Sequence, residues 1–387
     1  MSSGAAVFKT VLRTLQFIYR NRRATVIWSV PPQAKIAILD ATSAQFITPL
    51  CGAEKFEVIH VHGERLYLTL GILWSAFKWS IKTGQPQAGY AIALLERIRP
   101  IMAITFIDNA RLFYVVSQHH KGSRFLAIQN AARHDTAHLP PALAQEIHIP
   151  EFACFGEFEK DLYTRIGASV GRFYPIGSLR DAYYREQFGP RNTNIEYDIC
   201  IVGEASPGWD KLEYPGIEDA IGNIAKHAEM FGRKFNKRVC LASKRPALAA
   251  KERELQWYGK YIGDGVEVIG QVRNEYTTYG LIDRSHVTVA FISTALHEGL
   301  GRGKRSLFCN FTGLRKWDFP VDGIWCLTDP SYEAFEERML KLFEMSDSEF
   351  QALSFDAAKY TLNYDRNLPT HRFLQKLIVD AVSEEKR

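Results

Sequence analysis

Apolar runs alternate along the chain with stretches of helical periodicity, a pattern typical of α/β folds with parallel sheets. In the first half, strands are predicted over residues 35–41, 56–62, 101–108, 124–131 and 147–156. A long helical region, about residues 64–98, separates the second of these strands from the third. Residues 172–184 are interpreted as a connector.

The alternation restarts near Tyr197. Strands are then predicted over residues 197–204, 237–243, 266–270, 287–293, 305–311 and 323–329. The helices between them are predicted over residues 215–232, 274–283, 294–302 and 331–345. The predicted fold class is therefore α/β, with two Rossmann-like doubly wound domains that face each other across a cleft.

The two runs of alternation divide the chain into residues 1–180 and 181–367, followed by a last helix within 368–387 that can return to the first domain. A length of 387 residues agrees with two domains of roughly 100–200 residues each. Ligands of doubly wound sheets bind beyond the carboxyl ends of the strands, so we expect the site at the cleft between the domains.

The net charge and the cysteine pattern limit the classes of protein to which this chain can belong. A formal net charge of +5 suits an anionic small ligand or an anionic membrane surface, and it is too weak to indicate nucleic-acid binding. The six cysteines form no C-x-x-C pair, and several lie in apolar runs, which favours reduced thiols and a cytoplasmic location. No apolar run reaches the ~18–20 residues of a membrane span.

Residues 7–24 mix apolar positions with Lys9, Arg13 and further arginines. Two interpretations stay open for this segment. It can lie as an interfacial helix on anionic lipid, which would give the protein a peripheral contact with the inner face of the cytoplasmic membrane. It can also pack as an ordinary surface helix on the first domain.

The most informative segment is VAFISTALHEGLGRGKRSLFCNF, residues 289–311. Ser293 and Thr294 fall where a predicted strand ends and a helix begins, a place that favours phosphate binding. Glu298 follows one turn later on the same side of the helix and could accept hydrogen bonds from a ribose diol. His297 is adjacent, either near the nucleotide or packed in the helix. The same segment is also compatible with a capped helix that ends in a glycine-rich turn at Gly303.

This segment resembles the S-T-x-x-x-E-x-x-x-x-G-K pattern of GT-B glycosyltransferases. The matching residues are Ser293, Thr294, Glu298, Gly303 and Lys304. The resemblance implies that Glu298 holds the ribose and that the hydroxyl residues face phosphate. The same pattern occurs in polyol-phosphate transferases and in sugar-nucleotide epimerases.

A second resemblance spans about residues 35 to 380. The pieces AILDATSAQFITPL, ITFIDNARLFY, FLAIQNAARHD, YPIGSLRDAYY and YDRNLPTHRFL are similar to bacterial surface-carbohydrate (capsule or O-antigen) biosynthesis proteins related to retaining β-Kdo transferases. The resemblance implies transfer of Kdo or a related acid from a CMP donor to a glycan or lipid-linked glycan acceptor, with no cofactor besides the nucleotide sugar. It also implies an acceptor and catalytic domain in residues 1–180, a nucleotide-sugar domain in residues 181–367, and a covalent glycosyl adduct on Asp108.

Three predicted strand ends of the first domain carry candidate catalytic or sugar-binding groups. Asp108, with Asn109 after it, could act as nucleophile or base, or simply cap the next turn. Asp40 ends its strand in the same way. The third strand end carries Gln129, Asn130, Arg133 and His134. His134 could move a proton or bind a sugar carboxylate, or be an ordinary loop residue. We expect these groups to converge if the strands are parallel neighbours.

Two predicted strand ends of the second domain carry candidate nucleotide-binding residues, namely Gly203, Glu204, Ser243, Lys244 and Arg245. Lys244 and Arg245 could neutralise a phosphate or a sugar-acid carboxylate, or be solvated loop charges. The sequence has no G-x-x-x-x-G-K-[ST] loop, no zinc-type Cys/His cluster and no D-x-D motif, so a metal-independent enzyme is expected. A polyol-phosphate transferase, a sugar-nucleotide epimerase and a non-catalytic assembly subunit remain alternatives.

Overall fold

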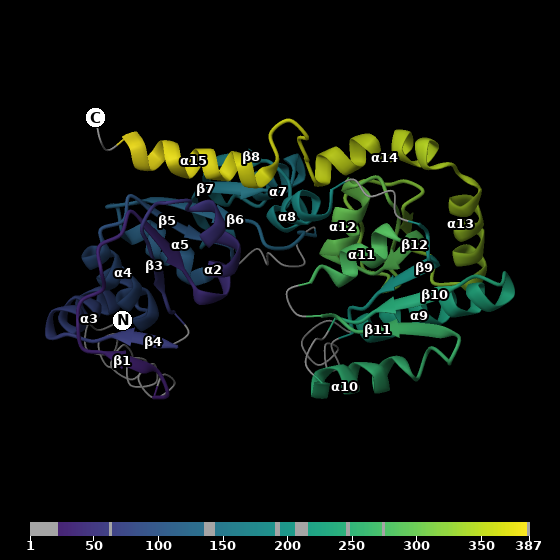
Figure 1. The fold of residues 1–387 in the computed structure, drawn as a ribbon, viewed down its shortest axis with the longest axis horizontal. Coiled ribbons are helices and arrows are strands. Elements are labelled where there is room, and N and C mark those ends of the chain that lie inside the picture. The colour runs from purple at the N-terminus through teal and green to yellow at the C-terminus, as the bar shows by residue number, and fades with distance from the viewer. Residues whose placement is uncertain are drawn as a thin grey trace.

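The chain folds around two parallel β-sheets, each flanked by helices (Figure 1). A computed structural model describes residues 22–61, 64–134, 144–189, 194–205, 216–244, 248–272 and 275–384. The predicted class, two Rossmann-like α/β domains, is confirmed. The segment expected to form an N-terminal amphipathic helix lies outside the described residues, except for residues 22–24.

The first sheet has six parallel strands in the order β3-β2-β5-β6-β7-β8. Its strands are β2 (Ile36–Leu39), β3 (Phe56–Ile59), β5 (Met102–Thr105), β6 (Arg124–Ile128), β7 (His148–Cys154) and β8 (Ser169–Pro175). A separate parallel pair is formed by β1 (Thr25–Ile27) and β4 (Arg65–Tyr67). Every residue of β2 and β5 is buried, as expected of central strands that are covered on both faces.

The helices of this half begin with α2 (Ala41–Ile47) and a short 3₁₀ turn, η1 (Thr48–Leu50). They continue with α3 (Leu70–Thr83), α4 (Pro86–Ile98), α5 (Arg111–His119), α7 (Glu157–Arg165) and α8 (Leu179–Phe188). Gly84, with φ 67°, ends α3, and Pro86 starts α4 where its missing N–H has no helical partner to lose. The predicted helical region 64–98 is thus one strand and two helices.

The second sheet has the order β11-β10-β9-β12-β13-β14, also all parallel. Its strands are β9 (Tyr197–Val202), β10 (Val239–Ala242), β11 (Val266–Ile269), β12 (Ser285–Ala290), β13 (Arg305–Cys309) and β14 (Cys326–Leu327). Its helices are α9 (Ile217–Lys234), α10 (Leu248–Tyr258), α11 (Thr277–Asp283), α12 (Thr294–Gly301), η3 (Arg315–Trp317), α13 (Tyr332–Glu344) and α14 (Asp347–Thr361). The strand order reverses between β9 and β12, where doubly wound folds place their ligands.

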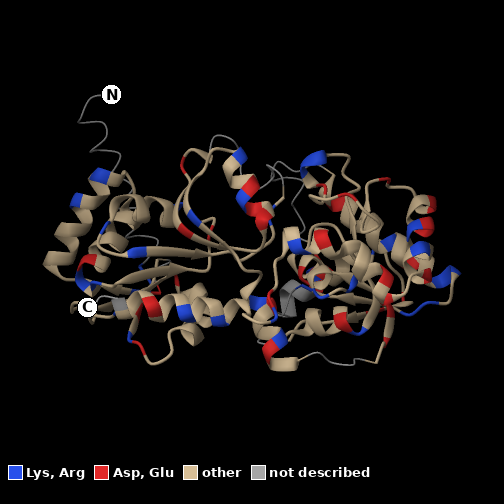
Figure 2. Ribbon diagram, turned by 90° about the horizontal axis from the view of Figure 1, so that it is seen from above, with Lys and Arg blue, Asp and Glu red and all other residues tan. Residues whose placement is uncertain are grey.

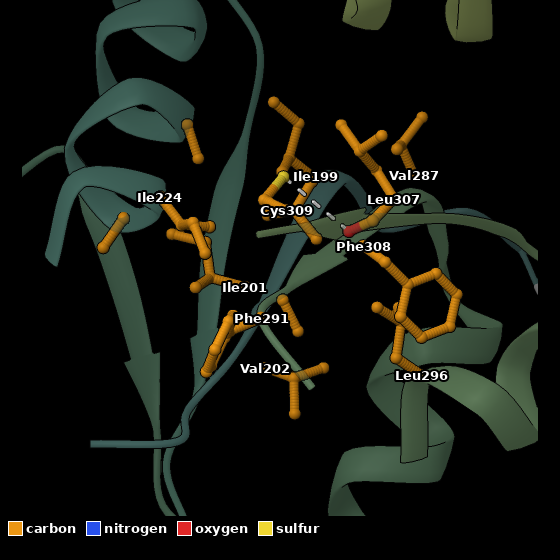
Figure 3. Packing of buried hydrophobic residues seen from close by; sticks show 14 of the residues in the cluster. Ile199, Ile201, Val202, Ile224, Val287, Phe291, Leu296, Leu307, Phe308 and Cys309 are labelled. Carbon is orange, nitrogen blue, oxygen red and sulfur yellow. Dashed lines mark hydrogen bonds between the residues drawn. The ribbon is translucent and has the colours of Figure 1, made fainter. Parts of the chain in front are cut away.

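Apolar side chains from the middle of this sheet form the core of the second domain (Figure 3). Ile201 of β9 and Leu307 of β13 lie on either side of β12, and Ile224 of α9 and Leu296 of α12 join the same buried cluster. Helices α9 and α12 are therefore held to the sheet by continuous apolar packing.

The last helix, α15 (Thr370–Glu384), runs back along the first domain (Figure 1). Leu374 and Ile378 are buried in one cluster with Ile36 and Met102 of the first sheet. Helix α8 contacts both domains, because Leu179 belongs to that cluster whereas the hydroxyl of Tyr184 donates to Asp283 of α11 at 2.7 Å. The boundary placed after residue 180 falls inside this helix.

The interpretation of residues 172–184 as a connector is wrong. They form the end of β8 and most of α8. Strand β8 pairs with β7 and lies at the sheet edge, where exposed Arg172 and Gly171 obscure the apolar pattern. Helix α8 begins at Ser178, whose hydroxyl accepts from the Asp181 N–H as an N-cap. Helix α14 was not among the predicted elements either.

Candidate functional site

The carboxyl ends of three neighbouring strands in the first sheet carry the polar residues predicted from the sequence. Strand β2 pairs in parallel with β5, and β5 pairs in parallel with β6. Asp40, Asp108 and the segment 129–134 therefore lie along one edge of the sheet.

Asp108 is the anchor of this edge, with none of its surface exposed. Its Oδ2 accepts from Nη2 of Arg133 at 2.5 Å, and its Oδ1 accepts from the backbone N–H of Asn130 at 3.1 Å. Nη1 of Arg133 donates to the carbonyl of Ala131 at 2.7 Å. Asp108 thus holds the loop after β6 in one conformation, while Asn109 is exposed.

Asp108 and Arg133 form an ion pair in which both side chains are buried. Burial disfavours the charged form of Arg133, but the charge of Asp108 and its hydrogen bond outweigh this, and the pKa of Arg133 is raised. Burial, followed by the charge of Asp108, raises the pKa of both Tyr114 and Tyr163. These two tyrosines lie around the pair and were missed in the sequence, because each falls within a helix with no motif to mark it.

Asp40 begins α2 as its N-cap. Its carboxylate accepts from the backbone N–H of Thr42 at 2.7 Å and from the Thr42 hydroxyl at 2.9 Å. Its φ of 92° lies in the region that favours glycine, a strained conformation of the kind that collects at functional edges of folds.

Gln129 joins three elements of the scaffold. Its Oε1 accepts from the Phe155 N–H at 2.7 Å, and its Nε2 donates to Glu159 at 2.8 Å and to the Ala131 carbonyl at 2.9 Å. Glu159 is buried, and burial raises its pKa to about 7. In this arrangement the Gln129 amide stabilises the edge from within instead of facing a ligand.

Glu204 has a comparable role in the second domain. Its carboxylate accepts from the backbone N–H groups of Phe291 at 2.6 Å and Ile292 at 3.0 Å, just before Ser293. Burial raises the pKa of Glu204 to about 7. A Cβ on Gly203 would lie 2.6 Å from the Ala242 carbonyl oxygen, so the close approach of β9 and β10 requires glycine there.

The end of β10 is held by Glu254 of α10, a residue that the sequence reading missed. Its carboxylate accepts from the Ser243 hydroxyl at 2.8 Å and from the Lys244 N–H at 2.9 Å. The Lys244 side chain is exposed. Arg245 lies outside the described residues.

Helix α12 starts at Ser293 and meets the first domain there. The Oγ1 of Thr294 accepts from the backbone N–H of Ala132 at 3.1 Å. Within the described chain, the Ser293 hydroxyl makes no capping hydrogen bond. The first turn of α12, with its positive dipole end, therefore lies against the loop that Asp108 holds.

The two predicted histidines pack together at this junction. The His134 ring lies 5.5 Å from the His297 ring and 6.1 Å from Trp317, a residue not singled out in the sequence. His297 is also enclosed by Phe308 and Phe319 at 4.7 and 5.0 Å. Burial lowers the pKa of His297 to about 3, so it is neutral at physiological pH.

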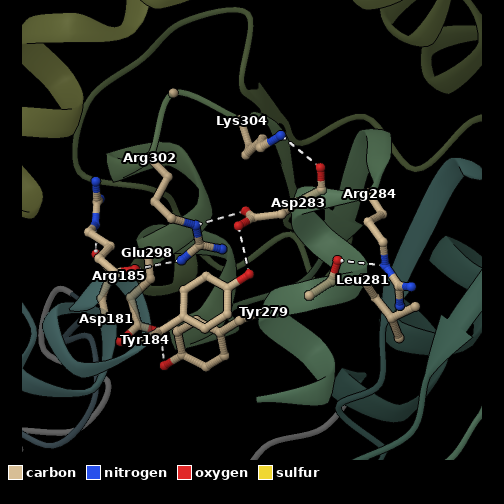
Figure 4. A network of polar contacts seen from close by, with 12 residues as sticks. Asp181, Tyr184, Arg185, Tyr279, Leu281, Asp283, Arg284, Glu298, Arg302 and Lys304 are labelled. Carbon is tan, nitrogen blue, oxygen red and sulfur yellow. Dashed lines mark hydrogen bonds and ion pairs between the residues drawn. The ribbon is translucent and has the colours of Figure 1, made fainter. Parts of the chain in front are cut away.

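Glu298 bridges the two domains (Figure 4). Its Oε1 accepts from the hydroxyl of Ser178 at 2.5 Å, and its Oε2 accepts from Tyr279 of α11 at 2.6 Å. Burial, followed by the charge of Asp181, raises the pKa of Glu298 to about 7. Two protein hydroxyl groups thus donate hydrogen bonds to the carboxylate that was expected to accept them from a ribose diol.

Arg302 forms a second bridge beside it (Figure 4). Its Nη1 lies 2.6 Å from Asp181 of α8, and its Nε lies 2.9 Å from Asp283 of α11. Arg302 belongs to the glycine-rich stretch of the motif, but the sequence attached no role to it. Gly303 follows with φ +77° as the C-terminal turn of α12, where a Cβ would meet the side chain of Gln351 at 2.8 Å.

Two hollows in the described structure lie away from this junction. One, of about 770 Å³, is lined at the amino ends of β6 and β7 by residues that include Arg124 and His148. The other, of about 410 Å³, lies beside β14 and α13. We place the site at the junction because doubly wound sheets bind ligands at the carboxyl edge. Among the described residues, no group of three or more His, Cys, Asp or Glu side chains could hold a metal ion.

Comparison by sequence finds no match for this chain, whereas comparison by structure finds several. The sequence matches no family model and no curated protein. In structure, the chain resembles a protein assigned as a UDP-N-acetylglucosamine 2-epimerase from Listeria monocytogenes, with TM-score 0.56 and 9% identity over 92% of this chain and 97% of the other.

Two further structures give the same result. UDP-GlcNAc 2-epimerase from Neisseria meningitidis, bound to UDP-GlcNAc, has TM-score 0.50 and 12% identity over 90% of this chain and 99% of its own. The UDP-forming α,α-trehalose-phosphate synthase from Burkholderia xenovorans has TM-score 0.50 and 10% identity over 92% and 100%. The chain has the GT-B fold. At such identities the similarity establishes the fold alone, and the chemistry has to be argued from the site.

Proposed function

We propose that the protein is a glycosyltransferase that binds a nucleotide sugar between its two domains. One observation carries this proposal: the first turn of α12, at the switch point of the second sheet, meets the carboxyl-edge loop of the first sheet through Ala132 and Thr294. This is where a GT-B fold brings donor and acceptor together, and it is also where backbone N–H groups and hydroxyls favour phosphate.

Ser293 and Thr294 would bind the phosphate of the donor. Glu204 supports this role, because its two hydrogen bonds to the preceding backbone keep the turn in place before any ligand arrives. The exposed side chain of Lys244, which follows β10 on the other side of β9, would add positive charge.

Glu298 would bind the ribose by exchanging partners. The hydroxyls of Ser178 and Tyr279 now donate to its two oxygens at 2.5 and 2.6 Å. A ribose diol offers the same two donors, so release of Ser178 from the other domain would free the carboxylate for the nucleotide without leaving it unpaired.

The burial of Asp108 supports a positioning role, in which it holds Arg133 and the segment 129–134 against the donor. A nucleophilic Asp108, as the Kdo transferase resemblance implies, would have to separate from Arg133 and become exposed during the reaction. The resemblance of the sequence segments supports CMP-Kdo or a related sugar acid as donor and a surface glycan as acceptor.

A sugar-nucleotide 2-epimerase is the second candidate, because a structure assigned to that activity shares the fold at TM-score 0.56. The two activities differ in one requirement. A transferase needs an acceptor to change its donor into product, whereas an epimerase converts the nucleotide sugar alone.

Ligand-dependent thermal stabilisation tests the proposal. A ligand that binds only the folded state at 100 times its Kd stabilises by about 2.7 kcal/mol. We expect CMP to raise the melting temperature more than CDP, UDP or GDP, and Ser293→Ala to reduce the rise. Ser169→Ala, at the start of β8, is the matched control. A rise with UDP alone would replace the CMP donor, and no rise with any nucleotide or nucleotide sugar would favour a non-catalytic protein.

A further inference from the structure

Helix α3 presents an apolar face to the outside of the molecule. We call this the α3 face, and it consists of Leu70, Leu73, Trp74, Phe77 and Ile81, which repeat at helical spacing. Leu70 is 88% exposed and Trp74 is 61% exposed. The opposite side of the helix packs closely on α4, where a Cβ on Gly89 would lie 2.3 Å from Oγ of Ser80. The α3 face is therefore the exposed side of the helix in the part of the chain that the structure describes.

Strand β1 extends this apolar surface. It pairs with β4, and the carbonyl of Ile27 accepts from the N–H of Leu68, the residue before the N-cap of α3. Trp28, which is 79% exposed, therefore lies beside the turn that begins the helix, and Val30 is also exposed. A soluble surface seldom gathers this many large apolar side chains without a partner.

The charges around the α3 face are positive. Helix α3 contains Lys78 and Lys82 and no acidic residue. Figure 2 shows the positions of Lys and Arg in blue and of Asp and Glu in red along the whole ribbon. The ammonium groups of these lysines lie 5.0 Å from the ring of Trp74 and 4.5 Å from that of Trp79. Glu96 of α4 is close by, but it accepts from Ser75 at 2.5 Å and from Nε1 of Trp79 at 2.9 Å.

The segments that surround the α3 face also carry a net positive charge. Residues 22–34 and 64–84 together hold five Lys or Arg (Arg22, Arg23, Arg65, Lys78 and Lys82) and one acidic residue, Glu64. Residues 7–21, which precede β1 in the sequence, also combine apolar positions with Lys and Arg. The α3 face lies at the end of the first domain remote from the second (Figure 1).

We propose that the α3 face, together with Trp28, docks on an anionic phospholipid surface. Tryptophan and leucine on one side of a helix, with lysines at its border, are the composition of helices that lie in a membrane interface. Lysine side chains can lay their stems along apolar surface and reach phosphate with their ammonium groups. A second copy of the chain fits less well, because two such surfaces would bring their positive charges together. No described helix is long and apolar enough to cross a membrane.

Vesicle flotation with the full chain tests this inference, and it is independent of the proposed catalysis because no nucleotide is present. We expect the protein to float with phosphatidylcholine vesicles that contain phosphatidylglycerol, and much less with phosphatidylcholine alone. Leu73→Ser/Trp74→Ser should lower the bound fraction at least about tenfold, and Lys78→Glu/Lys82→Glu should remove its salt dependence. Leu353→Ser/Phe355→Ser, which changes two exposed apolar residues of α14, is the matched control and should bind as the wild type does.

Trp28→Ser provides a second variant at a highly exposed position, so that a folding defect of the double variant would not decide the result. Equal binding of wild type, Trp28→Ser and a folded Leu73→Ser/Trp74→Ser would overturn the proposal. Loss of binding in Leu12→Glu/Leu15→Glu, with binding retained in the α3 variants, would assign the contact to the N-terminal segment and also overturn it. A wild type that binds no vesicle but forms a dimer, which Leu73→Ser/Trp74→Ser abolishes, would make the surface an interface between copies.

Discussion

The hydroxyl of Ser178 lies 2.5 Å from a carboxylate oxygen of Glu298, across the junction of the two domains. Ser178 caps α8 on the side of the first sheet, and Glu298 belongs to the helix at the switch point of the second. A single buried carboxylate thus connects domain contact with the expected ribose position. Its pKa of about 7 makes this connection sensitive to pH.

The first prediction concerns pH and Glu298. Because the folded-state pKa of about 7 exceeds the ordinary value of 4.5, the folded protein binds this proton more tightly than the unfolded chain. The contribution of Glu298 to stability is therefore highest below pH 4.5 and decreases as the pH rises to 7, by on the order of 3 kcal/mol.

Denaturant unfolding at pH 5 and pH 8 measures this effect. Glu298→Gln should lose less stability between the two pH values than the wild type does. Glu159 and Glu204 titrate in both proteins and cancel in the comparison. If the free energy of unfolding had the same pH dependence in the two proteins, the pKa of Glu298 would not be raised in the folded state.

The second prediction concerns the buried pair of Asp108 and Arg133. Asp108→Ala leaves a buried guanidinium without its carboxylate and should destabilise the protein by about 3–5 kcal/mol. Asp108→Leu/Arg133→Met removes both charges and should be more stable than the single variant. If the single variant were as stable as the wild type and retained full transfer activity, neither positioning nor nucleophilic catalysis could be assigned to Asp108.

The third prediction concerns Arg302, which pairs with Asp181 and Asp283. Arg302→Met removes a cation shared by two carboxylates and should lower the free energy of unfolding by about 3–5 kcal/mol. It should also widen the distribution of domain separations measured by small-angle X-ray scattering. Arg338→Met, in α13 of the second domain, is a control that should leave the scattering curve unchanged.

The fourth prediction concerns Glu204. Glu204→Ala leaves the N–H groups of Phe291 and Ile292 without their acceptor and should cost about 1–3 kcal/mol. Because these groups precede Ser293, the variant should also lose most of its stabilisation by nucleotide. Glu229→Ala removes a buried carboxylate that accepts from Gly263 elsewhere in the domain, and it should retain the nucleotide response. Equal nucleotide responses in both variants would place the phosphates away from α12.

Local pattern was sufficient to predict the strands of the two six-stranded sheets except β8. Strands such as β5 and β10 are buried on both faces, so their apolar runs are continuous and visible in the sequence. The segments at 172–184 and 347–361 were missed for a related reason. Edge strand β8 exposes three of its seven residues, and α14 has exposed Leu353 and Phe355 that weaken its apparent periodicity.

The sequence by itself determined where the buried strands end and where helices such as α12 and α13 begin, because those positions follow from apolar periodicity and capping chemistry. The tertiary structure decided what each polar side chain bonds to. Gln129, Ser243 and Glu204 were candidates for ligand contacts, yet each makes internal hydrogen bonds to groups far from it in the sequence. A buried polar group must find a partner, and the nearest partner in space is set by packing between elements, which no local pattern specifies. The same is true of Arg302, whose two carboxylate partners come from helices of different domains.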